Sequence, residues 1–530
     1  MNQQRTAVLG REVARRGILP FPEPVVISWC ATLVVALAAI FLVGSSWQVL
    51  VFDLLLIMSV LAVTLEIDHR ESYGSRKAKQ IRNKARRKRG EHVFVSPTDP
   101  RFGDPDSDPG WDKPVPLYRA EPVDLTGTGL DDMFIVEHRT PGDNDYYSVM
   151  IAMQGLAEGL RGDPEWAVTS SAFGRTLASF AKRSSFVRGI EILHRSVPED
   201  LIPHETWVAE QIKALGPAAE QVLPAIHSYG QLIDRIRPYS EGHRAYVVLI
   251  LPKSGDLLAE GARVARRKDA PLIGGIAQVI RDETMRAVAA LERAKMGRVE
   301  VYGEQRACAV IRACLDPTFP LESHKGVRWE NCWPSYVGGE DTVEVAGNWH
   351  TRVGTIPARS IEPVELGPLW LAPLLTGVAP DHGDDEIPAA PTIRTVMVRM
   401  DFVEASKARE AAKVDATQDR ATQIAEERKG KTTDGTSEVM ASASARRRED
   451  LKPGTGHHGV IYSMALSVTG RDEDDALRAC MRVEQAADEC GISEIEWQDH
   501  RHDVAMFLTL PLGRGLAATK HTRAKSTRLL

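Results

Sequence analysis

A glycine, a lysine and a threonine in succession are the closest match in this chain to a phosphate-binding loop. They are Gly430, Lys431 and Thr432. The full motif needs another glycine five positions earlier and a strand leading into the loop, so that backbone N–H groups surround the phosphates. That earlier position is Ala425, inside a charged stretch of strong helix formers. We therefore expect no nucleotide hydrolysis by this mechanism.

Two glycine-rich segments match the dinucleotide-binding fingerprint by letter only. Residues 454–459 lead into an expected strand, whereas the fingerprint needs a helix there to meet the pyrophosphate. Residues 513–518 follow an expected strand, but too few residues come after them for the rest of a βαβ unit. Both segments are interpreted as turns. No cofactor is predicted.

Cysteines and histidines are too widely spaced to predict a metal site. The six cysteines form no C-x-x-C pair, which favours structural thiols in a reducing compartment. The histidines at 457–458 and 500–502 lie among polar residues or glycines at expected strand edges. A zinc site would need a spacing wider than usual among Cys308, Cys314, His324 and Cys332. With no catalytic residue identified, the chain is predicted not to be an enzyme.

The stretch from Val25 to Thr64 is the most apolar part of the chain. Residues 25–43 carry no charge, and a helix of that length reaches roughly 28 Å, about the hydrocarbon thickness of a bilayer. Residues 44–46 (Gly-Ser-Ser) interrupt it, and a second apolar run, 47–64, contains one charge, Asp53. A secretory signal peptide has a shorter apolar region that ends at a cleavage site. The pattern therefore predicts a membrane hairpin of two helices.

Lysine and arginine flank this apolar stretch on both outer sides and are missing from its loop. The positive-inside rule then places both termini in the cytoplasm. We expect a multi-pass protein of the cell (plasma) membrane with a cytoplasmic body.

Charge is distributed unevenly along the chain. Residues 1–90 hold 14 Lys or Arg and 6 Asp or Glu, a net charge of +8, whereas the other 440 hold 52 and 66, a net of −14. This asymmetry argues against a general nucleic-acid binder and for an anionic surface near the N-terminus. A basic run next to the hairpin is suited to anionic lipid headgroups, at about 1 kcal/mol per charge, with nuclear localisation or DNA binding as the rival interpretation. Its residues are Arg76, Lys77, Lys79, Arg82, Lys84, Arg86, Arg87, Lys88 and Arg89.

Asp53 is the one candidate for a functional residue inside the predicted membrane hairpin. A carboxylate is costly in hydrocarbon, so an intramembrane aspartate is by default a functional candidate. It is equally consistent with a hydrated position near Trp47 or with pairing to another subunit. The residues leave these alternatives open.

The remainder of the chain predicts an α+β (mixed α/β) body. Residues 91–116 are rich in Pro, Gly and Asp and indicate a linker. Residues 117–400 alternate strand patterns with helical periodicity, as α+β or α/β domains do. Strands are expected at 133–138, 146–153, 187–194, 245–251 and 299–302, and helices around Trp166–Phe180, Trp207–Leu215 and 276–295.

Three further segments complete the predicted organisation. Residues 401–452 contain strong helix formers and few large apolar residues, which indicates a charged helical arm. Residues 453–512 predict a βαββ module, with strands at 460–468, 495–497 and 504–510 around a helix at 474–490. Asp472 to Asp475 cap that helix, because carboxylates stabilise the positive end of its dipole. A basic tail, 513–530, follows. The expected fold class is a membrane α-helical hairpin followed by a cytoplasmic α+β body with a charged helical arm.

The C-terminal module resembles the end of the N-terminal, non-ATPase half of conjugative secretion ATPases of the CagE/TrbE/VirB class. The matching features are strand 460–468 with Tyr462, the acid-capped helix, and residues 505–512 ending in Leu-Pro-Leu. In that family the ATPase core follows directly. The apolar hairpin is similar to a small two-span subunit found beside, or fused to, such ATPases. Together with Trp349 and segments 353–359 and 370–375, the chain resembles an actinobacterial membrane protein family of conjugative, type IV-like clusters.

This resemblance implies a structural membrane component of a type IV-like conjugation or secretion machine. The implied partners are a secretion ATPase in trans and other membrane subunits, in an oligomer that makes no direct sequence-specific contact with nucleic acid. A membrane subunit of an ESX (type VII) secretion system is the first alternative. A membrane-bound enzyme with an unrecognised site is the second.

Overall fold

The computed structural model describes residues 7–9, 23–44, 46–64, 73–139, 145–155, 162–199, 201–216, 219–321, 324–381, 390–429 and 435–514. The chain divides into two compact units, one of residues 13–92 and one of residues 1–12 and 93–530. The Gly-Lys-Thr sequence at 430–432 and the basic tail after Arg514 lie outside the described residues.

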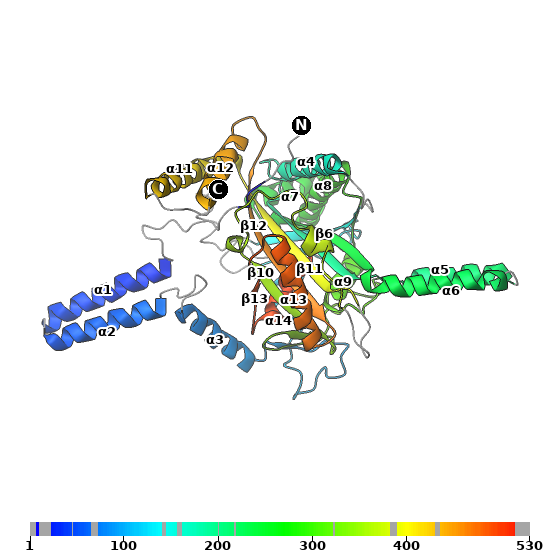
Figure 1. The fold of residues 1–530 in the computed structure, drawn as a ribbon, viewed down its shortest axis with the longest axis horizontal. Coiled ribbons are helices and arrows are strands. Elements are labelled where there is room, and N and C mark those ends of the chain that lie inside the picture. The colour runs from blue at the N-terminus through cyan, green and yellow to red at the C-terminus, as the bar shows by residue number, and fades with distance from the viewer. Residues whose placement is uncertain are drawn as a thin grey trace. The chain divides into compact units, whose positions relative to one another are not determined.

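The smaller unit contains helices α1 (Glu23–Val43), α2 (Trp47–Thr64) and α3 (Tyr73–Lys88). A short connection joins α1 to α2, which lie side by side (Figure 1). Trp29 Nε1 near the start of α1 donates a hydrogen bond to Thr64 Oγ1 at the end of α2, at 2.8 Å, so the two helices are antiparallel. Their large apolar side chains are mostly exposed, up to 92% for Phe41.

Across the described residues, no helix combines the length and the apolar character that crossing a bilayer requires. This finding contradicts the predicted membrane hairpin and the predicted multi-pass location in the plasma membrane, and both predictions are wrong. A span needs about 20 apolar residues in one continuous helix, and α1, with 21 residues, has the acidic Glu23 in its first turn. Helix α2 has 18 residues and includes Asp53.

The larger unit is an α+β body built on one sheet of 13 strands, paired antiparallel throughout the part described. The strand order is β1 (Val93–Phe94), β8 (Tyr336–Gly338), β9 (Val343–Val345), β10 (Trp349–Ile356), β12 (Gly459–Gly470), β11 (Ile393–Val403), β5 (Gly189–Pro198), β6 (Glu241–Pro252), β4 (Tyr146–Gln154), β3 (Ile135–His138) and β2 (Ala120–Pro122). Two short strands lie off this path: β13 (Glu496–Trp497) pairs with β10, and β7 (Arg298–Val301) with β4.

One face of the sheet is covered by helices. Because side chains alternate along a strand, every second residue of a central strand points to this face. Val247, Leu249 and Leu251 of β6 pack with residues of α7 and α8, and Leu466 and Val468 of β12 pack with residues of α10 and α13. The helices of this face are α4 (Asp163–Phe180), α7 (Gly255–Lys268), α8 (Leu272–Arg293), α10 (Ala372–Thr376) and α13 (Glu473–Glu489).

The opposite face is covered by α9 (Glu304–Leu315), by Trp329 and Trp333, and by the C-terminal segment. That segment forms α14 (His502–Ala505) and a 3-10 turn over Met506–Thr509. Phe507 lies near Trp333, with ring centroids 6.1 Å apart. The strand predicted for residues 504–510 is therefore wrong.

Two helical pairs complete the larger unit. Helices α5 (Ile202–Leu215) and α6 (Ala219–Ile236) connect β5 to β6 and extend away from the sheet as a hairpin (Figure 1). Helices α11 (Ala405–Lys429) and α12 (Thr436–Asp450) occupy most of the predicted charged arm. Ala408 and Ala412 of α11 pack with Val403 and Leu451 in a small core, so this pair is partly buried rather than fully solvated.

Candidate functional site

Asp53 lies on α2 and is buried, with 6% of its surface exposed. Both carboxylate oxygens are inaccessible and have no hydrogen-bond partner among the described residues. A buried carboxylate without a partner destabilises the fold that contains it. Asp53 is thus the one sequence-predicted site residue whose placement has an energetic cost.

Replacing Asp53 with leucine is expected to stabilise the pair of α1 and α2, because the unpaired carboxylate is removed. The effect should be on the order of 1–3 kcal/mol, or at least a fivefold slowing of local opening. Hydrogen–deuterium exchange of peptides from residues 23–64 measures it. Gln48→Leu, at an exposed position of the same helix, is the matched control. Faster exchange in Asp53→Leu than in the control would show that the carboxylate has a partner that stabilises the pair.

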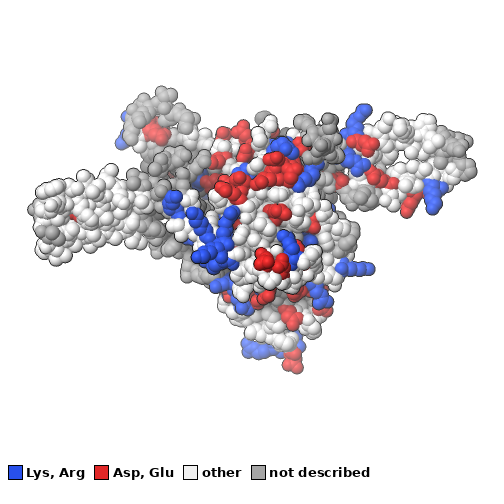
Figure 2. Space-filling view, turned by 90° about the horizontal axis from the view of Figure 1, so that it is seen from below, with Lys and Arg blue, Asp and Glu red and all other residues white. Residues whose placement is uncertain are grey.

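The predicted basic run lies on α3, with Arg89 directly after the helix. Lys77, Arg82, Lys84, Arg87 and Lys88 are exposed, and Figure 2 shows Lys and Arg gathered along this helix. Glu91 forms ion pairs with Arg86 (3.5 Å) and Arg89. Nothing in the structure tests the contact of this run with anionic headgroups, which stays a prediction.

A small cavity of about 60 Å³ lies where α13 begins beside the sheet. Arg471 and Arg482 line it and share the carboxylate of Asp381, at 3.4 and 3.3 Å. Arg471 also contacts Asp475 at 3.1 Å. Two guanidinium groups thus face two carboxylates, so the cavity has no excess charge with which to hold an ion.

The acidic start of α13 is a helix cap, as the sequence predicted. Asp472 Oδ1 accepts the backbone N–H of Asp475 at 2.7 Å. Burial opposes ionisation of Asp475, but hydrogen bonds from the backbone and side chain of Arg471 outweigh it and lower its pKa. The carboxylates of this segment therefore stabilise the helix end and hold Arg471 in place.

A second buried polar cluster lies on the sheet face that the C-terminal segment covers. The carbonyl oxygen of Gly513 accepts hydrogen bonds from Tyr146 Oη at 3.0 Å and from Arg399 at 3.2 Å. Arg399 also pairs with Asp401 at 3.2 Å, and only 2% of its side chain is exposed. Gly513 has φ +74°, and a Cβ there would lie 3.2 Å from the side chain of Ser148. The cluster anchors the C-terminal segment on the central strands.

Burial shifts the pKa values of His138 and Tyr146 in this cluster. His138 stacks on Tyr146, with centroids 4.5 Å apart, and its Nε2 lies 2.8 Å from Ser148 Oγ. Burial holds the pKa of His138 well below 6.5, and the charges of Arg514 and Arg399 lower it further. Burial also raises the pKa of Tyr146. Both side chains are thus neutral at pH 7, which suits an anchoring role.

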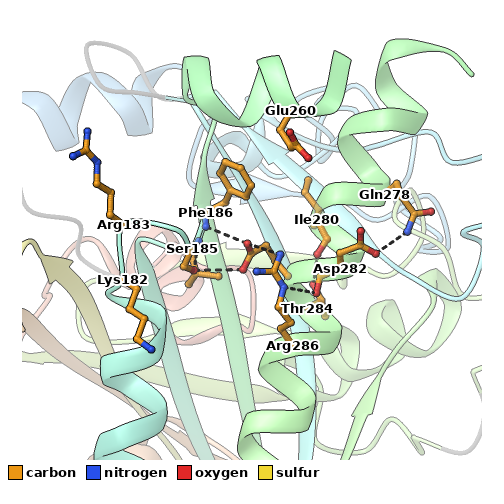
Figure 3. Close-up of polar contacts among 12 residues, drawn as sticks. Lys182, Arg183, Ser185, Phe186, Glu260, Gln278, Ile280, Asp282, Thr284 and Arg286 are labelled. Carbon is orange, nitrogen blue, oxygen red and sulfur yellow. Dashed lines mark hydrogen bonds and ion pairs between the residues drawn. The ribbon is translucent and has the colours of Figure 1, made fainter. Parts of the chain in front are cut away.

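A third cluster joins the loop after α4 to α8. Glu283 of α8 is 4% exposed and accepts hydrogen bonds from Ser185 Oγ and the Phe186 backbone N–H, both at 3.4 Å. Arg286, one turn later, pairs with the same carboxylate at 2.9 Å. Figure 3 shows Ser185 and Phe186 facing α8 beside Arg286. Glu283 therefore holds the loop against the helix.

Replacing Glu283 with alanine is expected to lower the free energy of unfolding by about 1–3 kcal/mol, because Ser185 and the Phe186 N–H lose a buried acceptor. Chemical denaturation measures the loss. Asp282→Ala, an exposed neighbour bonded to Gln278, should change stability by under about 0.5 kcal/mol. Equal losses in the two variants would contradict the assigned role of Glu283.

The cysteines and histidines considered as metal ligands do not come together in groups of three or more in the described part of the chain, and Cys308, Cys332 and His502 are buried. Cys332 contacts Cys308, and burial raises its pKa well above 9.0, whereas Cys314 lies beside Arg195. His502 is buried, and its Nδ1 accepts the Val353 N–H at 3.0 Å. In the described ranges, no group of three or more His, Cys, Asp or Glu is placed to hold a metal ion.

No protein-family model matches this chain, and a search of curated proteins finds no match either. The buried clusters around Arg399 and Glu283 were not predicted from the sequence, because each joins residues that lie about 100 or more positions apart. A charged residue within an apolar strand pattern, such as Arg399 after residues 396–398, was the one available signal.

Proposed function

We propose that this protein is a structural, non-catalytic subunit of a type IV-like conjugation or secretion machine and works beside a separate ATPase. The observation that carries the proposal is the C-terminal module, in which β12 is followed by the acid-capped helix α13 as in the resembling domains, although residues 505–512 contain a helical turn in place of the strand that ends those domains. Strand β12 pairs with β10 on one side and β11 on the other, so the module is an integral part of the sheet. Membrane anchoring is not part of the proposal.

The outer face of α13 is a suitable docking surface for such a partner. Met481 lies in the middle of the helix and is 70% exposed. Exposed carboxylates lie two turns before and after it on the helix, at Glu473, Asp474, Asp488 and Glu489, and one turn away Glu484 and Arg478 are exposed. An exposed apolar side chain within an acidic surface favours a partner with a basic rim and an apolar centre.

Capture of the ATPase encoded in the same gene cluster tests the proposal. We expect the immobilised full-length chain to retain that ATPase, and Met481→Arg to weaken retention at least tenfold, because a positive charge then lies against the partner's apolar centre and inside its basic rim. Met285→Arg, at a 48% exposed methionine of α8, is the matched control and should retain the ATPase as the unmodified chain does.

Two results would count against this function. The first is the absence of any association with that ATPase at micromolar concentrations. The second is tight ATP binding or turnover by the purified chain alone, which would favour an enzyme. Equal weakening by Met481→Arg and Met285→Arg would remove α13 as the docking surface but not the association itself.

A further inference from the structure

Three polar side chains lie on the face of the sheet that carries Gly513. His138 of β3 pairs in register with Tyr146 of β4, and Ser148 follows two residues later on the same strand. Because side chains alternate along a strand, Tyr146 and Ser148 point to one face. His138 Nε2 lies 2.8 Å from Ser148 Oγ. A serine hydroxyl and an imidazole at this distance are the nucleophile and the base of acyl-transfer chemistry.

His138 is held in the state that a general base needs. Its ring stacks on Tyr146 with an angle of 12° between the planes, which fixes its orientation. Burial, assisted by the charges of Arg514 and Arg399, holds the pKa of His138 well below 6.5, so the imidazole is neutral at pH 7. In the tautomer whose proton is on Nδ1, Nε2 accepts the hydroxyl proton of Ser148 and is able to remove it during an attack.

The carbonyl group of Gly513 is polarised by two donors. Tyr146 Oη and Arg399 Nη1 both donate to its oxygen, at 3.0 and 3.2 Å. Burial opposes the charge of Arg399, but Asp401, Tyr146 and Glu191 outweigh it and raise the pKa of the guanidinium, which stays charged. Donors in this position stabilise the negative charge that develops on a carbonyl oxygen under nucleophilic attack.

The glycine at position 513 brings this carbonyl group against Ser148. Its φ of +74° is readily adopted only by glycine, and a Cβ there would lie 3.2 Å from Ser148 Cβ. The same Cβ would lie 3.3 and 3.4 Å from the side chains of Val248 and Ile250. No side chain therefore separates the Gly513 backbone from Ser148, and apolar groups close the site beside them.

We propose that Ser148 cleaves the peptide bond between Gly513 and Arg514 of its own chain. Ser148 Oγ attacks the Gly513 carbonyl carbon while His138 removes the hydroxyl proton. The bond from that carbon to the Arg514 nitrogen then breaks, and His138 returns the proton to the leaving amine. Water hydrolyses the resulting ester, which leaves a Gly513 carboxylate and restores the Ser148 hydroxyl. Each chain reacts once, so this inference is independent of the structural role proposed above.

Intact-mass spectrometry of the purified full-length chain tests the proposal. Near pH 7 we expect a product that ends at Gly513 and a peptide that begins at Arg514. Ser148→Ala should slow cleavage at least about 100-fold, because the nucleophile is lost. Tyr146→Phe should slow it at least about tenfold, because it removes one donor to the carbonyl oxygen and keeps the aromatic ring. Ser171→Ala, at an exposed position of α4, is the control and should be cleaved as the unmodified chain is.

Hydroxylamine distinguishes this reaction from a purely anchoring role of the cluster and from cleavage by a contaminating protease. It intercepts the Ser148 ester, so the product should end in a Gly513 hydroxamate instead of a carboxylate. This readout uses the unmodified chain and does not depend on whether a variant folds. An unmodified chain that stays intact, cleavage that persists in folded Ser148→Ala, or a product without hydroxamate would each overturn the proposal.

Discussion

Replacing Arg394 with methionine will lower the free energy of unfolding by about 3–5 kcal/mol, the loss expected when one partner of a buried ion pair is removed. The guanidinium of Arg394 is 1% exposed. It forms two hydrogen bonds to the carboxylate of Glu241, at 2.8 and 3.0 Å. It also donates to the carbonyl oxygens of Leu374, Leu375 and Thr392, so the substitution removes hydrogen bonds to a carboxylate and to three carbonyls.

A surface pair of the same residue types is the control for this prediction. Arg263 pairs with Glu260 on α7 and is 63% exposed, so Arg263→Met should leave the denaturant midpoint almost unchanged. Denaturant midpoints of the two variants give the comparison. A loss below about 1 kcal/mol for Arg394→Met would mean that the surrounding segment rearranges to satisfy Glu241.

Lowering the pH from 6.5 towards 4 will destabilise the protein by about 1.4 kcal/mol per pH unit for each buried neutral histidine. His194 is mostly buried, and burial lowers its pKa to about 4, assisted by the charges of His243 and Arg394. His138 is more enclosed than His194, and its burial holds its pKa well below 6.5. Below pH 6.5 the unfolded chain takes up protons that the native histidines do not, so stability falls as the pH falls.

Replacing one of these histidines isolates its contribution to the pH dependence of the unfolding free energy. We expect His194→Gln to reduce the slope of unfolding free energy against pH by about 1.4 kcal/mol per unit between pH 6 and 5. His457→Gln, at an exposed position, is the matched control. Denaturant titrations at several pH values give both slopes. Identical slopes in the two variants would show that His194 is protonated in the native state.

Strands that are buried on both faces were predictable from the sequence, because each is a nearly continuous apolar run. The strands expected at 146–153, 245–251 and 460–468 are present as β4, β6 and β12, each extended by a few residues. These strands lie in the interior of the sheet with packed layers on both faces, so apolar side chains are needed at successive positions. The helix expected at 474–490 and its acidic cap were also confirmed, because capping is a local property.

Elements whose conformation depends on distant residues were not predictable in the same way. Residues 504–510 form a short apolar run, and such a run does not distinguish a strand from a buried helical turn. The hydrogen bond from the Val353 N–H to His502 fixes this segment in a helical form against β10. The buried arginines of β11 likewise depend on partners such as Glu241, which lies 153 positions away from Arg394.

The order of the strands in the sheet also determines which parts of the larger unit can fold first during synthesis. Strands β1, β8, β9 and β10 join the rest of the described sheet only through β12, whose last residue is Gly470. Strands β2 to β6 pair among themselves and are complete by Pro252, so that half can form while translation continues. Until β12 is inserted, the edges of β10 and β11 remain open to pairing with other chains. A nascent chain therefore has its longest exposure to misassociation between the synthesis of β10 and that of β12, which makes this interval the point at which a chaperone has most effect.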